Sequence, residues 1–272
     1  MRGMLPGKTV NAEEAGLRKG KPAAKKAAPE AEEAELLFDK TYICPVCERE
    51  FTSKTVRSGK AFPDRMDIDL RSRYKNIEPI KYRVVGCIRC HYAALDVDFS
   101  SPLKREVDAF RDSSSEIRLD ANCLEEVRSF RDALLLLRAA LSISLIKGSK
   151  NSERAGIALQ TAWLLRSMGE QQVKTEPEET KPEEKNAVSF AEMEQKYLRY
   201  ALQYFVKARQ LEDFPIRGMD EGTFDYLLAA LCYETGQPRE AHGYVTKALR
   251  NREINRKLRR MAEDLLAELR SS

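Results

Sequence analysis

Residues 42–47, Tyr-Ile-Cys-Pro-Val-Cys, and residues 87–92, Cys-Ile-Arg-Cys-His-Tyr, enclose the stretch that decides the fold. Each C-x-x-C pair can wrap one edge of a metal ion, and two pairs together make a tetrahedral four-thiolate site. When the protein supplies all four ligands, no position stays open for a substrate, which favours a structural role. The spacing therefore predicts a metal site formed by Cys44, Cys47, Cys87 and Cys90.

Zinc is the metal that this ligand set favours, because it accepts tetrahedral thiolates without redox chemistry. Iron in a rubredoxin-like site uses the same ligands and is the alternative. His91 follows the last of these cysteines. It could act as a fifth ligand or a base, but a side chain that supports the second cysteine pair is favoured. Cys123 and Cys232 stand alone in helical patterns and are expected to be buried small hydrophobes.

The sequence around the cysteines predicts a small zinc-ribbon-like β module at 39–100, with short strands at 51–56, 80–85 and 93–99. It holds few large apolar side chains, so the metal is expected to hold the module together. Residues 1–38, a basic stretch followed by an acidic one, are expected to form a disordered tail.

A polar loop at 61–79 holds the candidate functional residues other than the cysteines. These are Asp67, Asp69, Arg71, Arg73 and Tyr74. The two aspartates lie on the same side of an extended segment and could share a cation, as a metal-dependent enzyme would require. The favoured alternative is that they pair with neighbouring arginines and fix the loop over the metal site.

Residues 101–272 are predicted to form an all-α domain with a mobile insert, rich in Pro, Glu and Lys, at 170–187. Helices are expected from Ser101, within 120–147, and at 152–168, 189–211, 221–234, 238–250 and 254–269. The pair around Gly236 resembles a tetratricopeptide-type hairpin, with small residues where helices touch and glycine between them. An ordinary helical bundle is the alternative. The predicted class is thus α+β, mainly α.

The first helices of such hairpins would present a groove for a protein partner. The candidate residues are Trp163, Arg166, Thr223, Tyr226 and Tyr233. Aromatic and arginine side chains dominate peptide-binding hot spots, yet the alternative that Trp163 and the tyrosines are core residues is equally weighted. Capture of a C-terminal carboxylate is not expected, because Leu227 stands where a clamp asparagine would be.

The last helices carry Lys247, Arg250, Arg252, Arg256, Lys257, Arg259 and Arg260 against the single Glu253. Such a stripe could bind phosphate backbones. No aromatic residues are interleaved to stack on bases, so a solvated helix face is favoured. His242 is expected on a helix surface.

The composition is typical of a soluble folded chain, with 42% hydrophobic and 33% charged residues and a net charge of +4. No run approaches the roughly 20 apolar residues that span a bilayer. The N-terminal region lacks a signal-peptide hydrophobic core. We therefore expect a cytoplasmic protein without membrane contact, in which paired cysteines bind metal rather than form disulfides. No small-molecule substrate is evident.

The cysteine stretch resembles an uncharacterised bacterial family, "domain of unknown function 2225". The matching positions are 42–47, Phe51, 67–70, Tyr74, Pro79, Tyr82 and 87–93. The resemblance is close over about 42–100 and loose beyond it, and it implies a cysteine module followed by tetratricopeptide-like helices, with no activity. The family's knuckles often carry glycine after the second cysteine, whereas this sequence has Glu48 and His91. The backbone N–H to sulfur geometry is the feature that this departure affects.

Together these patterns predict a non-enzymatic interaction or adaptor protein, with a structural zinc module and a helical domain that holds a protein partner. A nucleic-acid-binding zinc-ribbon protein is the alternative. A metal-dependent or redox enzyme that uses the four-cysteine site or the Asp67/Asp69 pair is the third hypothesis.

Overall fold

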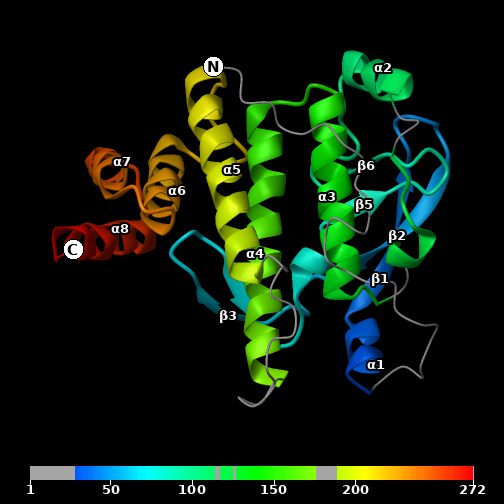
Figure 1. Ribbon diagram of the computed structural model, residues 1–272, viewed down its shortest axis with the longest axis horizontal. Coiled ribbons are helices and arrows are strands. Elements are labelled where there is room, and N and C mark those ends of the chain that lie inside the picture. The colour runs from blue at the N-terminus through cyan, green and yellow to red at the C-terminus, as the bar shows by residue number, and fades with distance from the viewer. Residues whose placement is uncertain (1–27, 114–116, 125–126, 176–188, 272) are drawn as a thin grey trace. The chain divides into compact units, whose positions relative to one another are not determined.

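The computed structural model describes residues 28–113, 117–124, 127–175 and 189–271. Short antiparallel strand pairs come first and helices follow, which confirms the predicted, mainly helical α+β class (Figure 1). The strands are β1 (Leu37–Ile43), β2 (Glu50–Val56), β3 (Pro63–Met66), β4 (Ser72–Tyr74), β5 (Val84–Gly86) and β6 (Ala93–Leu95). The helices are α1 (Ala28–Glu35), α2 (Lys104–Ser113), α3 (Phe130–Ile146), α4 (Asn151–Thr175), α5 (Phe190–Leu211), α6 (Glu221–Glu234), α7 (Pro238–Arg250) and α8 (Arg256–Ser271).

The chain forms two compact units that do not follow the predicted domain boundary at residue 100. The first unit takes in the chain up to Pro63, Tyr74–Ser149 and Leu164–Met193. The second contains Asp64–Arg73, Lys150–Trp163 and Glu194–Ser272. The boundary differs because α3 packs against β5 and β6, and so belongs with the cysteines rather than with the later helices.

A cluster of aromatic rings forms part of the first unit's core. Phe99 lies 5.3–5.8 Å, between ring centroids, from the rings of Tyr42, Phe51 and Tyr92. Tyr92 in turn meets Phe110 of α2 at 5.4 Å. Edge-to-face contacts of this kind add stability beyond the buried area. The cysteine module therefore has a larger apolar core than the sequence predicts, because it shares α2 and α3.

Helix α3 begins at a capping box and buries one apolar face. The Ser129 hydroxyl accepts a hydrogen bond from the Asp132 amide, and the Asp132 carboxylate accepts one from the Ser129 amide. Such a box satisfies two amides that would otherwise lack partners at a helix start. The face toward the strands includes Leu136, Leu137 and Ile143, all buried.

Two segments predicted to lack structure are helical, and these predictions are corrected. Residues 28–38, assigned to the disordered tail, contain α1 and the start of β1. Residues 170–175, assigned to the insert, continue α4 beyond Gly169. A glycine inside a helix costs only about 1 kcal/mol, so Gly169 does not end this one. The rest of the predicted tail and insert, 1–27 and 176–187, lies outside the described residues.

The second unit is helical, with two adjoining hydrophobic cores. One is formed by the first part of α4 with α5 and α6, and the other by α6, α7 and α8. Asp220 caps α6 by accepting a hydrogen bond from the Thr223 amide at 2.7 Å. Among the residues that the structure describes, no helix has both the length and the apolar run that a membrane crossing requires.

Candidate metal centre

The two C-x-x-C pairs lie in turns of the same design, one after β1 and the other after β5. In the first turn the Cys44 amide donates to the Arg49 carbonyl at 2.9 Å, and the Glu48 amide donates to the Cys44 carbonyl at 2.8 Å. In the second turn the Cys87 amide donates to the Tyr92 carbonyl, and the His91 amide to the Cys87 carbonyl, both at 2.8 Å. Each short strand pair thus presents its cysteines on one rigid knuckle.

Glu48 and His91 take the backbone conformation that glycine would take most easily. Their φ angles are +60° and +61°. A left-handed conformation costs about 1–2 kcal/mol for a residue with a side chain. The backbone N–H groups of Val46 and Cys47 lower the pKa of the Cys44 thiol, and those of Arg89 and Cys90 oppose the rise in the pKa of the Cys87 thiol. Both turns keep their backbone hydrogen bonds although neither residue is a glycine.

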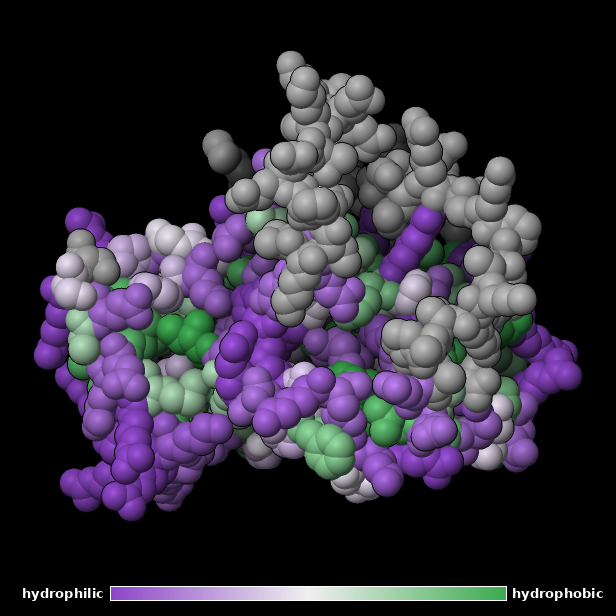
Figure 2. All heavy atoms as spheres, turned by 90° about the horizontal axis from the view of Figure 1, so that it is seen from below, coloured by the Kyte–Doolittle hydropathy of each residue, from purple (hydrophilic) through white to green (hydrophobic). Residues whose placement is uncertain are grey.

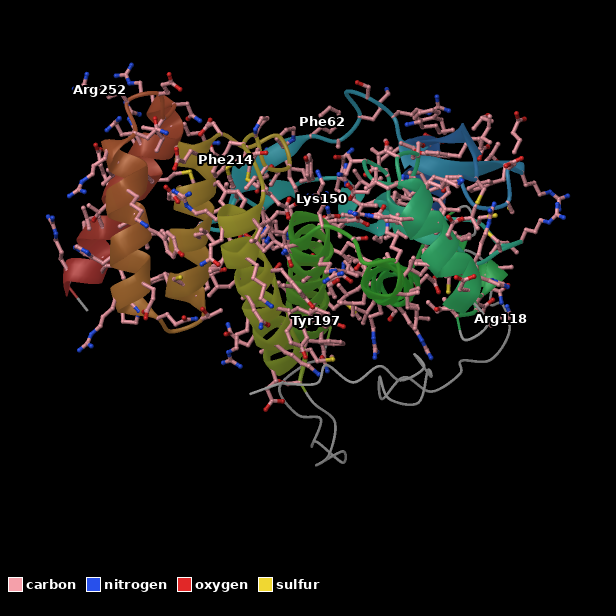
Figure 3. The ribbon with its side chains drawn as sticks, turned by 90° about the horizontal axis from the view of Figure 1, so that it is seen from above. Phe62, Arg118, Lys150, Tyr197, Phe214 and Arg252 are labelled. Carbon is pink, nitrogen blue, oxygen red and sulfur yellow. The ribbon has the colours of Figure 1, made fainter. Side chains whose placement is uncertain are left out.

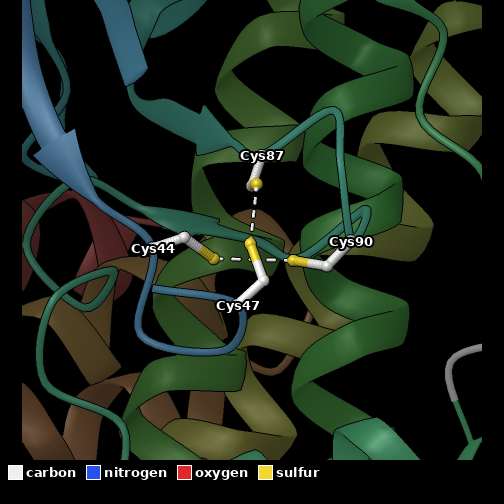
Figure 4. Close-up of side chains that lie close together, drawn as sticks. All are labelled: Cys44, Cys47, Cys87 and Cys90. Carbon is white, nitrogen blue, oxygen red and sulfur yellow. Dashed lines mark hydrogen bonds between the residues drawn. The ribbon is translucent and has the colours of Figure 1, made fainter. Parts of the chain in front are cut away.

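The four sulfur atoms converge from the two knuckles, as Figure 4 shows. All four Sγ atoms lie within 4.8 Å of one another. Cys44 Sγ lies 3.5 Å from Cys90 Sγ, and Cys47 Sγ lies 3.7 Å from Cys87 Sγ. Zinc–sulfur bonds of about 2.3 Å place tetrahedral sulfurs about 3.8 Å apart. The arrangement can therefore hold one tetrahedral metal ion with little movement, as the cysteine spacing predicts.

Burial and contacts between thiols lower the pKa of one cysteine of the cluster and raise the pKa of two others. The Cys90 thiol and the Cys47 and Val46 amides favour the Cys44 thiolate and, against desolvation, lower its pKa to about 5. Cys90 has its pKa raised by the same contact with Cys44 and by burial. Burial also raises the pKa of Cys87. Thiolate is the form that binds metal, and a divalent cation would supply the charge that lets all four sulfurs ionise together.

His91 supports the second knuckle through its ring nitrogen. Its Nδ1 accepts a hydrogen bond from the Leu119 amide at 3.1 Å. Partial burial and the charge of Arg118 lower the pKa of the imidazole, which keeps this nitrogen an acceptor. His91 is not part of the metal-ligating cluster found among the described residues. His242, by contrast, is exposed on α7, as predicted.

The acidic loop is built as a tight turn between β3 and β4. The Asp67 amide donates to the Arg71 carbonyl at 2.8 Å, and the Leu70 amide donates to the Asp67 carbonyl at 3.1 Å. Asp67 pairs with Arg73, with Oδ2 2.6 Å from Nε. The predicted pairing of the aspartates with arginines holds here. The turn belongs to the second unit and the cysteines to the first, and its predicted position over the metal site stays a prediction.

Asp69 is fully buried and receives the indole N–H of Trp163 at 2.7 Å. Arg71, also buried, donates its amide to the Asp69 carboxylate at 3.4 Å. Asp67 thus pairs with Arg73, while Asp69 accepts the indole N–H, and neither belongs to a group of three or more metal-ligating side chains among the described residues. Tyr74 lies at the end of β4 and is partly exposed.

The Leu70 side chain attaches this turn to the helices of the second unit. Its φ angle is +67°, a conformation that disfavours a leucine. Its side chain packs against both hydrophobic cores of the second unit, and Ile68 packs against one of them. The apolar area that the partly buried leucine removes from water offsets this backbone strain. The loop is thus a structural insertion into the helical unit.

The Asp69–Trp163 contact gives a direct optical test, since Trp163 is the single tryptophan of the chain. Asp69→Ala leaves the indole N–H and neighbouring Arg71 without this carboxylate, and we expect a loss of about 2–4 kcal/mol. Tryptophan emission should shift to the red, and thermal unfolding of the second unit should start earlier. Asp69→Asn keeps an acceptor oxygen, so its emission maximum and its unfolding temperature should lie between those of Asp69→Ala and the wild type. Unchanged emission in Asp69→Ala would contradict the insertion.

The residues predicted to line a partner groove are mostly engaged within the chain. Trp163 donates to Asp69, and the Tyr233 hydroxyl donates to Glu268. Thr223 sits in the first turn of α6, where its hydroxyl donates to Asp220. Tyr226 has no exposed surface, and burial and then the charge of Asp69 raise the pKa of its hydroxyl. The core alternative therefore holds for Tyr226. Arg166 belongs to the other unit.

Arg128 is a buried cation of the first unit that was not predicted from the sequence. Its guanidinium donates to the carbonyls of Lys81 and Val84 at 3.2 and 2.9 Å, and to the Ser53 hydroxyl at 3.1 Å. The guanidinium also lies over the Tyr82 ring at 5.5 Å, and burial lowers the pKa of Arg128 to about 10. No local pattern marks it, since its acceptors lie 44–75 residues away along the chain.

A second missed contact anchors α1 to the first unit. Glu33 lies 2.6 Å from the Lys81 ammonium and accepts a hydrogen bond from the Tyr82 hydroxyl at 2.7 Å. The lysine is almost fully buried. The acidic run that reads as a tail in sequence thus supplies one specific ion pair.

Comparison with known proteins agrees with the family resemblance. A family model described as "uncharacterized protein conserved in bacteria (DUF2225)" matches residues 37–269. Neither the curated proteins nor the solved structures contain a match. The matched range includes all four cysteines, both knuckles and every helix from α2 through α7.

Proposed function

The chain belongs to this bacterial family, DUF2225, and we propose that it is a non-enzymatic, cytoplasmic interaction protein built on a structural zinc centre. The observation that carries the proposal is the closed set of four sulfurs, all supplied by the chain. Zinc accepts this geometry with no redox chemistry, and no coordination position remains for a substrate. The centre then serves to tie the two knuckles together.

The enzymatic alternatives find little support at the candidate residues. His91 Nδ1 accepts a hydrogen bond from the Leu119 amide. The buried Asp69 carboxylate accepts one from the Trp163 indole. Among the described residues, the four cysteines form the one group of three or more side chains suited to a metal ion.

The protein-binding part of the proposal rests on the helical hairpin of α6 and α7. These helices are joined at Gly236, whose φ is +75°, and α7 begins at Pro238. Ala229, Ala241 and Ala248 are fully buried, as close helix contacts in tetratricopeptide-like repeats require. Because Tyr226 is buried, a protein partner would use the outer surface of this hairpin rather than the aromatic face first considered.

Metal exchange tests the structural role. We expect chelated protein to lose protease resistance in the first unit, and equimolar Zn²⁺ or Cd²⁺ to restore it equally. Both ions prefer tetrahedral thiolates, and a structural site needs nothing more. A reddish iron protein with a reversible reduction would replace the proposal by the redox alternative. If the chelated protein keeps full resistance, the centre is not structural.

The interaction role has its own test. The tagged full chain is used as bait in extracts of its native host, with and without nuclease treatment. We expect a defined protein to be retained in stoichiometric amount after nuclease, by both the zinc and the cadmium forms. Loss of every stoichiometric protein from wild-type bait would count against a protein partner.

A further inference from the structure

A dense concentration of positive charge lies where α7 turns into α8. Residues 238–260 hold eight arginines and lysines against two glutamates, a net charge of +6, while the whole chain carries +4. The remainder of the chain is therefore slightly acidic. All of these cations except Arg259 are exposed. Arg239 lies at the start of α7, and we call the other six the basic corner: Lys247, Arg250, Arg252, Arg256, Lys257 and Arg260.

The basic corner is not neutralised within the described part of the chain. None of its six members forms an ion pair with a described carboxylate. Lys247 contacts the Tyr244 ring at 5.2 Å, the one cation–π contact among them. Figure 2 shows strongly hydrophilic side chains gathered over this end of the helices, and Figure 3 shows Arg252 pointing away from the α7–α8 turn.

Arg259, the seventh cation of the predicted stripe, holds the corner in shape. Its guanidinium donates to the carbonyls of Leu249 and Asn251 at 3.1 and 3.0 Å, at the end of α7. The Asn255 side chain accepts a hydrogen bond from the Leu258 amide at 2.8 Å at the start of α8. Ile254 is buried beneath the turn. The exposed cations are thus carried on a fixed backbone.

The positions of these cations oppose the local preference of the helix. The first turn of α8 contains no acidic residue, and Arg256, Lys257 and Arg260 stand near its positive end. Cations there are unfavourable by about 0.3–1 kcal/mol each at low ionic strength. They also repel one another, and no ion pair with a described carboxylate compensates for this repulsion. Features that oppose local stability are expected at functional surfaces.

We propose that the basic corner binds the phosphodiester backbone of nucleic acid, RNA or DNA. Six exposed cations on one rigid turn match a chain of regularly spaced phosphates, and their release of counterions would drive binding. No exposed aromatic residue accompanies them: Tyr244 is partly buried against the helical cores. The contact therefore reads charge rather than base sequence. This proposal does not depend on the identity of the metal.

The test measures fluorescence anisotropy of labelled single-stranded RNA, single-stranded DNA and duplex DNA, of equal length and mixed sequence, with the full metal-loaded chain. If all six cations contact phosphates, affinity for duplex DNA should fall roughly a thousandfold between 50 and 200 mM salt. The triple variant Arg252→Glu, Arg256→Glu, Arg260→Glu should weaken binding at least tenfold at low salt. Arg259 is left unchanged because it supports the turn.

The matched control makes the same change in net charge elsewhere: Lys104→Glu, Arg105→Glu, Arg199→Glu, all exposed. It should bind within about twofold of wild type, and both variants should keep wild-type circular dichroism. The relative affinities for RNA and DNA identify the source of the phosphates. Equal losses in both triple variants, or no binding at 50 mM salt, would overturn the proposal. So would polyglutamate competing as well as nucleic acid of equal charge, since it would indicate an acidic protein partner.

Discussion

Cys44→Ser is expected to abolish stoichiometric metal binding and to unfold the knuckles of the first unit. The serine oxygen replaces one of four sulfurs, and the remaining three thiolates no longer close the site. Structural zinc contributes an apparent binding free energy of about 10–16 kcal/mol in small zinc peptides, and this energy is also folding free energy. The effect should therefore exceed that of any single contact elsewhere in the chain.

Metal content and amide hydrogen exchange measure the result together. Exchange protection should be lost at β1, β5 and β6, which flank the cysteines, and kept in α5 through α8 of the second unit. Cys123→Ala is the control, because Cys123 is a buried thiol of the same unit outside the cluster. It should retain the metal. A Cys44→Ser protein with full metal content would show that the cluster is not the binding site.

Arg128→Met should be the most damaging single change that leaves the cysteines intact. It removes the donors to two buried carbonyls and to Ser53, along with the stacking over Tyr82. Each buried group left without a partner costs about 1–3 kcal/mol. We expect a total loss of roughly 3–5 kcal/mol, which is a large part of the stability of a small domain.

Urea unfolding followed by circular dichroism gives the size of this loss, and exchange at Val84 locates it. Arg105→Met removes an exposed arginine of α2 and should change the midpoint little. Metal content at neutral pH should remain at the wild-type level in both variants. If Arg128→Met unfolds like Arg105→Met, the buried guanidinium does not hold the strands to α3.

The metal cluster could be predicted from sequence because its signal is local and chemical. Two C-x-x-C pairs specify four ligands wherever the intervening chain runs, and the structure brings all four together. Helices α6 and α7 were predicted at their observed bounds for a similar reason. Asp220, Gly236 and Pro238 mark their ends, and each acts through the residues beside it.

The features that the sequence did not predict depend on contacts between segments that lie far apart along the chain. The Asp67–Arg71 turn reads as a polar loop, yet Leu70 is held between two helical cores. The sequence left a groove position and a core position for Tyr226 equally weighted, and the helices of the second unit bury it completely. The unit boundary inside α4 has no mark in the sequence, because one continuous helix serves two cores. α1 was missed because an Ala/Glu-rich segment has no apolar period of its own.

X-ray absorption at the zinc edge shows whether the four cysteines form a closed, all-thiolate metal centre. The protein is purified without added metal, so that the native ion is retained. We predict one zinc per chain with four sulfur neighbours at about 2.3 Å and no lighter neighbour in the first shell. A nitrogen or oxygen ligand at about 2.0–2.1 Å, or three sulfurs with an exchangeable water, would contradict a structural role and open the site to chemistry.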